Sequence, residues 1–300
     1  MKKDLFRVFG SEELGRLFLP DGFSYENTQA YRISPFHGRA VALKESDYRW
    51  ISVKGGGWNY GGPQVYLSNK DEELIFGLYP LESAERELSV SRAIETFSDA
   101  FPKVLYYKNL CDYVLPKPFV DVSTATFRNG KQVKPCLLYT QLRCPVRVAD
   151  LMYFTEEERK EAVASCCRYW NVPSEEYTEK FTERLASHVA LMHKNGCIND
   201  TLDYGNVTLL AEVVDYEWVT VPNIRLPDGT FGLEITEERR EKEILYGAEV
   251  CLQLRAMLWQ DCNLFEVYRE FVSAYATVNR EFTEKNERIQ KFLRKEEFIL

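Results

Sequence analysis

The sequence predicts an α+β fold in two lobes, a β-rich N-terminal lobe over residues 1–142 and a mostly helical C-terminal lobe over residues 143–300. Two observations lead to this prediction. Short β-branched and aromatic runs separated by turn-forming residues dominate the first lobe. Longer segments with apolar residues at helical spacing dominate the second. A chain of 300 residues is long enough for each lobe to have its own core.

Five runs in the first lobe have the composition of β-strands. They are rich in β-branched, aromatic and other apolar residues, and Gly, Asp, Asn and Lys punctuate the chain between them, as turns require. The last run is apolar enough to be a buried strand. The predicted strands are 39–43, 49–53, 63–67, 73–79 and 136–142.

A change of period marks one helix within the first lobe. After Pro80, apolar residues recur approximately on one helical face, and a proline is well suited to the first turn of a helix. The sequence therefore predicts a helix over residues 81–97. The residues of its apolar face are Leu81, Leu88, Ala93 and Ile94.

The second lobe has the start and stop signals of helices. Thr155 and Glu158 form a capping-box pattern, which predicts a helix directly after them. We expect a second helix from an N-cap at Ser174 to about Asn195, with Gly196 as its C-terminal stop. The later predicted elements are two short strands, 206–210 and 211–218, and charged helical segments from about residue 236. A β-rich lobe with one helix, a connecting strand and a helical lobe is the layout of a protein-kinase-like fold.

Composition and charge exclude several classes of protein. With 45% hydrophobic and 28% charged residues, the chain has an ordinary globular composition. A net charge of −8 argues against a nucleic-acid partner, because such proteins neutralise phosphates with clustered Lys and Arg. Asp4 and Arg7 interrupt the N-terminus, which therefore lacks the apolar core of a signal peptide. No apolar run approaches the ~20 residues of a membrane span. We expect a cytoplasmic protein without a membrane partner.

The eight cysteines do not form a metal-binding pattern. They contain no C-x-x-C pair, and the chain has only three histidines. This spacing does not fit a zinc site, and buried, reduced thiols are the interpretation we favour. The positions are 111, 136, 144, 166, 167, 197, 251 and 262.

A lysine followed by glycines is a candidate phosphate-binding element. Lys54 ends a predicted strand, and three glycines, Gly55 to Gly57, follow it. Glycines allow a phosphate to approach the backbone, although a surface lysine before an ordinary turn has the same pattern. Lys44 is the second candidate, because no glutamate at a suitable place on a following helix accompanies it. In a kinase-like site a helix glutamate orients the strand lysine.

Three glutamates on the predicted helix are candidate partners for this lysine. Glu82, Glu85 and Glu87 share the segment after Pro80. Any of the three can pair with Lys54, and the alternative is a solvated helix face.

Asn206 and Asp215 are candidate magnesium ligands. They lie nine residues apart, with a short apolar stretch between them, and a hairpin there brings two hard oxygen ligands to one metal. An ordinary hairpin with polar tips is the alternative. A kinase has its catalytic aspartate five residues before the asparagine, where this chain has Thr201.

Other polar residues near this stretch are candidates for the catalytic base. Asp200 and Asp203 lie near Thr201, and either can substitute for the absent aspartate or cap a turn. His193 ends an amphipathic helix and is better explained as a packing or capping residue.

Four blocks of the chain together resemble the selenoprotein O family of kinase-fold protein adenylyltransferases. The family's G-R-A-(I/V)-x-L-x-E and R-W-x-(I/L)-x-(L/V)-K-G-x-G are matched by GRAVALKE from Gly38 and RWISVKGGG from Arg49. Its S-x-x-R-E-(F/L)-x-x-S-x-A is similar to SAERELSVSRA from Ser83, which selects Glu87 over Glu85 as the lysine's partner.

The first two motifs form one block and the helix motif the second; the third block begins in the last predicted strand of the first lobe, and the fourth lies in the second lobe. The family's strand followed by I-R-x-G-x-F-x-x-F is similar to CLLYTQL followed by VRVADLMYF, which places Arg147 on the family's arginine. The family's G-F-x-H-G-V-M-N-T-D-N and D-Y-G-P have the same spacing as Gly196, Asn206 and Asp215. The resemblance covers about residues 36–220.

The resemblance implies that ATP binds with its terminal phosphates in a basic pocket and that AMP passes to a protein Ser, Thr or Tyr hydroxyl. It implies that Lys54, oriented by Glu87, binds phosphate beside Gly55 and Gly57. It also implies that Arg147 helps to neutralise the buried phosphates.

The same resemblance implies that Asn206 and Asp215 hold Mg²⁺, or Mn²⁺ in its place. The family also lacks the catalytic aspartate at the position of Thr201, and Asp203 is our candidate base.

The chain also departs from the family. The family's aspartate before the metal-binding asparagine is Gly205 here, and the arginine-rich stretch after its K-G-x-G is not recognisable. Two alternatives to AMP transfer therefore stay open. One is a protein or small-molecule kinase that transfers the γ-phosphoryl group from conventionally oriented ATP. The other is a pseudokinase, a nucleotide-binding or interaction module without catalysis.

Overall fold

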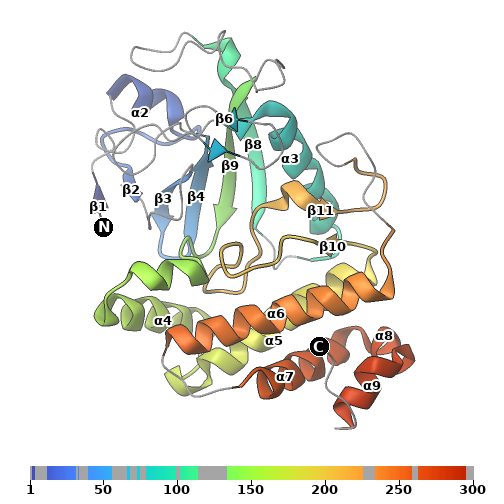
Figure 1. Cartoon of the computed structure of the whole chain (residues 1–300). Coiled ribbons are helices and arrows are strands. Elements are labelled where there is room, and N and C mark those ends of the chain that lie inside the picture. Colours follow the sequence, from blue (N-terminus) through green and yellow to red (C-terminus); the bar gives the residue numbers. More distant parts are fainter. Residues whose placement is uncertain are drawn as a thin grey trace. The chain divides into compact units, whose positions relative to one another are not determined.

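A computed structural model of the chain shows an α+β protein with an antiparallel sheet (Figure 1). It forms two compact units, residues 1–92 with 102–145, and residues 93–101 with 146–300, which we call the sheet unit and the helical unit. The predicted boundary at 142 and 143 lies three residues before this one, and the inclusion of residues 93–101 in the helical unit was not predicted. The residues described are 2–3, 12–31, 33, 40–55, 66–67, 73–74, 79–98, 102–113, 134–225, 234–258 and 263–294.

The sheet unit contains a seven-stranded antiparallel sheet in the order β1-β2-β3-β4-β9-β7, with β8 also paired to β9. A separate pair of short strands, β5 and β6, lies outside this sheet. The strands are β1 (Lys2–Lys3), β2 (Gln29–Tyr31), β3 (Ala40–Ser46), β4 (Arg49–Lys54), β5 (Tyr66–Leu67), β6 (Glu73–Leu74), β7 (Tyr79–Pro80), β8 (Lys103–Asn109) and β9 (Pro135–Leu142).

The strands predicted at 39–43, 49–53 and 136–142 correspond to β3, β4 and β9. Those predicted at 63–67 and 73–79 are present only as β5, β6 and β7, and residues 63–65 and 75–78 lie outside the described residues. Strand β8 was not predicted.

Strand β4 lies inside the sheet, with β3 on one side and β9 on the other. Its side chains alternate between buried and partly exposed, and Ile51 and Val53 are on the buried face. Two ladders of backbone hydrogen bonds fix the end of the strand, where Lys54 is opposite Ala40 of β3 and Leu138 of β9. The sheet therefore holds the Lys54 backbone from both sides.

The core of the sheet unit lies between the sheet and helix α2 (Glu12–Phe18). The Tyr139 hydroxyl crosses this core and donates a hydrogen bond to the Phe18 carbonyl oxygen at 3.1 Å, and its ring stacks on Tyr106. The sequence assigned no element to residues 12–18. The buried residues are Phe18, Leu19, Ala30, Val41, Leu43, Ile51, Val53, Leu110, Leu137 and Tyr139.

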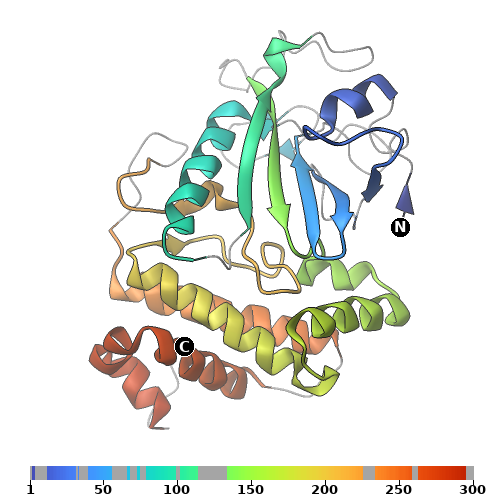
Figure 2. The ribbon, with the colours of Figure 1, turned by 180° about the vertical axis from the view of Figure 1, so that it is seen from behind.

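Helix α3 (Leu81–Glu95) begins directly after β7 and runs beside β8 (Figure 2). Its Ser91 hydroxyl accepts a hydrogen bond from the Val104 amide of β8 at 3.0 Å. The short 3-10 turn η2 (Leu110–Asp112) ends β8. The helix begins where Pro80 predicted it, and the last two predicted residues, 96 and 97, form a turn instead.

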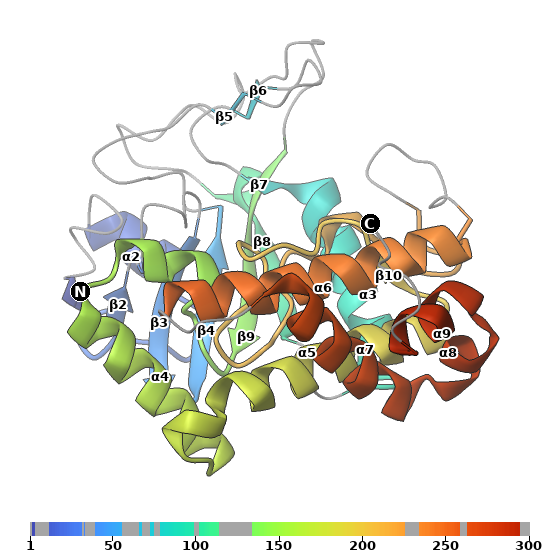
Figure 3. The same cartoon turned by 60° about the horizontal axis from the view of Figure 1, so that its bottom comes forward.

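The helical unit is built around three long helices that pack on one another, α5, α6 and α7 (Figure 3). Short strands and 3-10 turns connect them. The elements are η4 (Val148–Tyr153), α4 (Glu156–Trp170), η5 (Ser174–Glu176), α5 (Tyr177–Lys194), β10 (Ile198–Asn199), η6 (Tyr216–Trp218), β11 (Val219–Thr220), α6 (Glu237–Met257), α7 (Leu264–Val278), α8 (Arg280–Lys285) and α9 (Glu287–Leu293).

The helix boundaries test the predicted caps. Thr155 accepts from the Glu158 amide and Glu158 accepts from the Thr155 amide, so the predicted capping box is confirmed. The N-cap predicted at Ser174 is wrong, because that residue begins η5 and α5 starts after Glu176. The α5 helix ends at Lys194, and Gly196 follows in the left-handed region at a φ of 68°.

The two strands predicted at 206–210 and 211–218 are wrong. The segment folds back through one isolated bridge between Val207 and Val213, and a tight turn from Thr208 to Glu212 closes it. A second bridge pairs Thr208 with Arg147. Backbone groups that would extend a hairpin therefore form hydrogen bonds with the segment before η4 instead. The turn back is present, but the strands are not.

The seven described cysteines are free thiols. Cys136, Cys166, Cys167, Cys197 and Cys251 are buried as predicted, whereas Cys111 is exposed and Cys144 is partly exposed. Cys262 lies outside the described residues. Within the described part of the chain, no helix has both the length and the apolar character needed to cross a membrane.

Candidate functional site

In the sheet unit, Lys54 and Glu87 form a buried ion pair. The Lys54 Nζ lies 2.8 Å from the Glu87 Oε1, and the side chains are 12% and 4% exposed. Strand β4 presents the lysine and helix α3 presents the glutamate, 33 positions later in the chain. Both charges have lost most of their water, so each depends on the other for its stabilisation.

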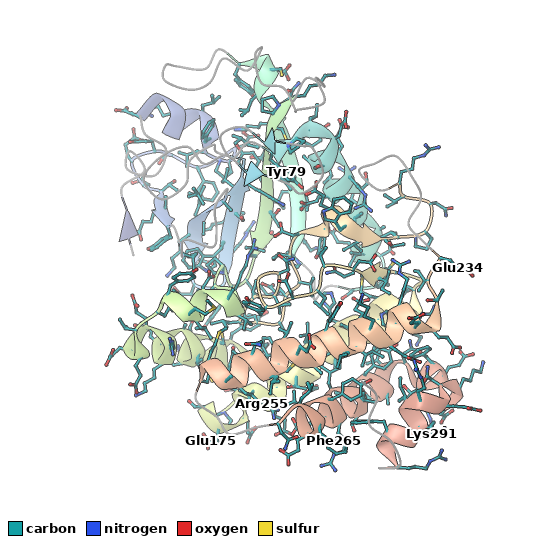
Figure 4. The ribbon with its side chains drawn as sticks, in the orientation of Figure 1. Tyr79, Glu175, Glu234, Arg255, Phe265 and Lys291 are labelled. Atoms are coloured by element: carbon teal, nitrogen blue, oxygen red, sulfur yellow. The ribbon has the colours of Figure 1, made fainter. Side chains whose placement is uncertain are left out.

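Tyr79 completes the surroundings of this pair. Its hydroxyl donates a hydrogen bond to the Glu87 Oε1, and the Lys54 Nζ lies 4.2 Å from the centre of its ring. Figure 4 labels this tyrosine, which lies in the short strand before α3. The sequence analysis missed Tyr79. The only signal in the sequence was its position directly before Pro80 and the predicted helix. In the structure, Tyr79 begins β7, which pairs with β9 next to β4.

Gly55 is required directly after the lysine. Its φ is 99°, and a Cβ there would lie 2.3 Å from the Cys136 carbonyl oxygen and 2.9 Å from the Tyr79 Cβ. A residue with a side chain would therefore meet both a backbone conformation that disfavours it and a steric clash. Gly57, the other predicted phosphate-binding glycine, lies outside the described residues, as does Gly38 of the first matched block.

The other candidates for the lysine and its partner lie at the surface. Glu82 and Glu85 are exposed on α3, and Glu85 accepts a hydrogen bond from the Tyr107 hydroxyl at 3.1 Å. Lys44 forms an ion pair with Asp47 at 2.8 Å, three residues further along. Among the candidate lysines and glutamates, only Lys54 and Glu87 form an ion pair with each other that is largely shielded from water.

In the helical unit, Arg147 brings Asn206 and Asp215 together. Its Nη1 lies 3.0 Å from the Asp215 Oδ2, 3.5 Å from the Asn206 Oδ1 and 2.8 Å from the Gly205 carbonyl oxygen. The oxygens of both predicted metal ligands therefore converge on one cationic nitrogen. Asn206 also donates from Nδ2 to the Thr201 carbonyl oxygen at 2.9 Å, which fixes the orientation of its amide.

Backbone hydrogen bonds position Arg147 against the turn. The Val148 amide donates to the Val207 carbonyl oxygen, and the Ala149 amide donates to the Tyr204 carbonyl oxygen, both at 2.9 Å. Asp150, which is fully buried, accepts from the Arg147 amide at 2.6 Å. The segment before η4 and the 204–209 segment are thus joined along their length, which directs the Arg147 side chain toward Gly205.

Asp215 has a left-handed backbone, with φ 63° and ψ 68°. Such a conformation is uncommon for a residue with a side chain, although Asp and Asn adopt it more readily than most, and it often occurs at functional positions. The Val214 amide before it donates to the Asn206 carbonyl oxygen at 2.8 Å, which holds the two candidate ligands at the same end of the turn.

Asp203, the candidate base, is exposed and precedes Asn206 by three residues. Its Oδ1 accepts a hydrogen bond from the Gly205 amide at 2.6 Å. Partial loss of water raises the pKa of Asp203, while the hydrogen bonds from the Gly205 and Asn206 amides and the charge of Arg147 act in the opposite direction.

A buried polar network holds Asn199, which directly precedes the segment from Asp200 to Asn206. Most of this network was not predicted from the sequence. The carboxylate of Glu243 contacts the His193 Nε2 at 2.8 Å and accepts from the Asn199 amide at 3.0 Å. The His193 Nδ1 lies 2.8 Å from the Tyr275 hydroxyl. His193 is buried, and both of its ring nitrogens contact polar partners within this network. Burial raises the pKa of Glu243, and only its place among the apolar positions of α6 pointed to it in the sequence.

The donor set of Asn206 and Asp215 fits a hard divalent cation. Both residues offer oxygen atoms, which Mg²⁺ prefers, and such sites commonly use one or two carboxylates and complete the shell with water and phosphate. Across the described residues there is no cluster of three or more His, Cys, Asp or Glu arranged to hold a metal. A protein-only metal cage is therefore not formed by that part of the chain.

These features define an α+β protein with a buried Lys–Glu pair in one unit and a convergent Arg, Asn and Asp set in the other. No protein-family model matches the chain, and no curated protein matches its sequence.

Proposed function

We propose that the protein is a kinase-like, ATP-dependent enzyme that transfers AMP to a protein hydroxyl, in the manner of the selenoprotein O family. The buried Lys54–Glu87 ion pair carries this proposal. Burying two charges costs free energy, and replacing such a pair with apolar residues is often neutral or stabilising. A pair in this position, followed by a glycine that keeps side chains away, is therefore better suited to phosphate binding than to stability alone.

The helical unit supplies the second set of residues. Asn206 and Asp215 are proposed to hold Mg²⁺, or Mn²⁺, together with phosphate oxygens of ATP. A cation bound there supplies positive charge that neutralises the phosphates during transfer. Arg147, whose guanidinium already contacts the Asp215 carboxylate, is proposed to contribute a further positive charge to the same phosphates.

The chemistry follows from these assignments. The acceptor hydroxyl oxygen attacks the α-phosphorus of ATP. The bond from that phosphorus to the oxygen bridging toward the β-phosphate breaks, and pyrophosphate leaves with that oxygen. Asp203 takes the hydroxyl proton, and its raised pKa makes it a stronger base than an ordinary surface aspartate. Lys54, oriented by Glu87, stabilises negative charge on the phosphates.

Self-labelling with radioactive ATP tests the proposal. The full chain is incubated with Mg²⁺ or Mn²⁺ and ATP labelled on the α- or the γ-phosphate, beside the Lys54→Met and Asp215→Ala variants. Protein-bound label from α-labelled ATP alone, lost in both variants, is the expected result. Label from γ-labelled ATP alone would make the protein a kinase. ATP binding without transfer or hydrolysis, measured by calorimetry, would make it a pseudokinase.

A further inference from the structure

A cavity of about 550 Å³ lies beside Asp203, within the helical unit. The loop from Asp200 to Tyr204 forms one wall, α6 forms another, and Leu264 at the start of α7 closes the end. In Figure 4 the labels of Arg255 and Phe265 mark this end of α6 and this start of α7. The volume falls within the range of roughly 300–1,000 Å³ that is usual for ligand pockets.

The cavity is distinct from the candidate metal ligands. Neither Asn206 nor Asp215 is among the residues that line it, and Arg147 does not line it either. Only Asp203 belongs to both the cavity and the proposed catalytic set. A group bound in the cavity therefore lies next to the proposed base without occupying the place of the cation.

The lining combines an apolar base with aromatic walls. Leu202 and Val250 are buried, and they contribute apolar surface from the loop and from α6. Tyr204 and Tyr246 are partly exposed on the two walls, and the Lys242 Nζ lies 5.5 Å from the centre of the Tyr246 ring, so one aromatic wall already has a cation beside it. Aromatic faces of this kind attract a cation placed over them, by about 0.5–1 kcal/mol at exposed sites.

All charged groups of the lining are acidic. Asp200, Asp203 and Glu249 line the cavity, and no Lys, Arg or His does so among the residues that the structure describes. Asp200 is already paired with Arg239. Asp203 accepts from backbone amides, and Glu249 has no hydrogen-bond or ion-pair partner within the described ranges. A hollow lined by one sign of charge concentrates ions of the opposite sign.

We propose that this cavity binds an arginine side chain of the acceptor protein and so places the neighbouring hydroxyl beside Asp203. Arginine fits better than lysine, because its planar guanidinium stacks on tyrosine and forms paired hydrogen bonds with carboxylates. The identity of the ligand as part of an acceptor rests on the proposed function. The preference for a guanidinium rests on the lining alone.

The test is a ligand-detected NMR titration of the full chain without nucleotide. The probes are N-acetyl-arginine methylamide and N-acetyl-citrulline methylamide, which have nearly the same shape and differ in charge. The wild-type protein is expected to bind the arginine compound at least about threefold more tightly, the effect of one exposed ion pair. Glu249→Gln should remove most of this preference.

Glu238→Gln is the matched control, because Glu238 is exposed on the same helix and does not line the cavity. It should keep the wild-type preference. Equal binding of the two probes by the wild-type protein would overturn the proposal. So would an equal loss of preference in both variants, which would indicate a general effect of net charge, or tighter binding of N-acetyl-lysine methylamide than of the arginine probe.

The experiments distinguish a failure of the cavity proposal from a failure of the proposed function. An arginine preference that depends on Glu249, found together with an absence of AMP transfer, would support the cavity and overturn the proposed function. AMP transfer found with equal binding of both probes would do the reverse. Circular dichroism of Glu249→Gln checks that the helices stay folded, as expected for a substitution at an exposed residue.

Discussion

The Arg147 Nη1 lies 3.0 Å from the Asp215 Oδ2, and the same nitrogen is 3.5 Å from the Asn206 Oδ1. A guanidinium therefore stands at the point where both proposed metal ligands meet. Cation and guanidinium compete for the same carboxylate, because each is stabilised by the same negative charge. A metal bound by Asp215 would have to share its carboxylate with the Arg147 guanidinium or displace it.

Removing the guanidinium should strengthen metal binding in the absence of nucleotide. Arg147→Ala is expected to lower the Kd for Mn²⁺ about fivefold, since a partly exposed ion pair contributes roughly 1 kcal/mol. Titration followed by electron paramagnetic resonance of free Mn²⁺ measures the change. Arg147→Lys retains a charge and should stay closer to wild type. Unchanged or weaker Mn²⁺ binding in Arg147→Ala would mean that Asp215 is not a metal ligand.

Breaking the buried ion pair should destabilise the sheet unit. Glu87→Gln removes the carboxylate charge that pairs with Lys54 and is expected to lower the free energy of unfolding by about 3 kcal/mol. Urea-induced unfolding measures this loss. Glu85→Gln, on the exposed face of the same helix, should change it by less than about 0.5 kcal/mol.

The double variant tests whether the two residues act together. In Lys54→Met with Glu87→Gln, neither member of the pair carries a charge, so the loss should be smaller than the sum of the single losses. Strictly additive losses would show that the contact contributes nothing.

Alanine substitutions at two glycines with a positive φ distinguish the cost of a steric clash from the cost of backbone strain. Gly55→Ala is expected to cost about 3 kcal/mol or more, because its Cβ would lie 2.3 Å from a backbone oxygen of β9. Gly22→Ala has a φ of 86° but nothing within 4 Å of the new Cβ, so strain alone should cost about 1 kcal/mol. Thermal or urea unfolding compares them. Equal losses at both positions would contradict the close approach of Gly55 to β9.

Acid should destabilise the helical unit through His188. This side chain is buried on α5, and desolvation lowers its pKa well below the ordinary value of 6.5. The unfolded chain therefore binds a proton that the folded chain excludes, and stability falls as the pH drops below 6.5, by at most about 1.4 kcal/mol per unit.

A substitution that cannot titrate isolates this contribution. His188→Gln should be less stable than wild type near neutral pH but should lose less stability between about pH 7 and about pH 5. Urea unfolding at both pH values measures the difference. Equal losses in the two proteins would place the acid sensitivity on other groups.

Local sequence rules predicted much of the fold. The capping box at Thr155 and Glu158 and the helix start after Pro80 depend on residues within one turn of each other, so they can be read without tertiary structure. Strands β4 and β9, inside the sheet, were also predicted from the sequence, because their apolar composition reflects their burial. Ser174 failed as an N-cap because a 3-10 turn precedes α5, and a cap pattern cannot distinguish the two.

The chemistry of the candidate site depended on contacts between distant residues. Lys54 and Glu87 are 33 positions apart, and Arg147 and Asp215 are 68 positions apart. Composition left three glutamates open as the partner of Lys54, and the resemblance to a known family selected Glu87. Only the packing of α3 places that glutamate at 2.8 Å from the lysine, while Glu85 faces water.

The sequence by itself determined which side chains were available, a lysine before glycines and an Asn and an Asp nine residues apart. The tertiary structure alone decided that no strands separate Asn206 from Asp215. The backbone groups of that segment bond to the chain around Arg147, which brings a guanidinium to both residues. Hydrogen bonding within a segment follows local rules, whereas its choice of a distant partner follows from how the whole unit packs.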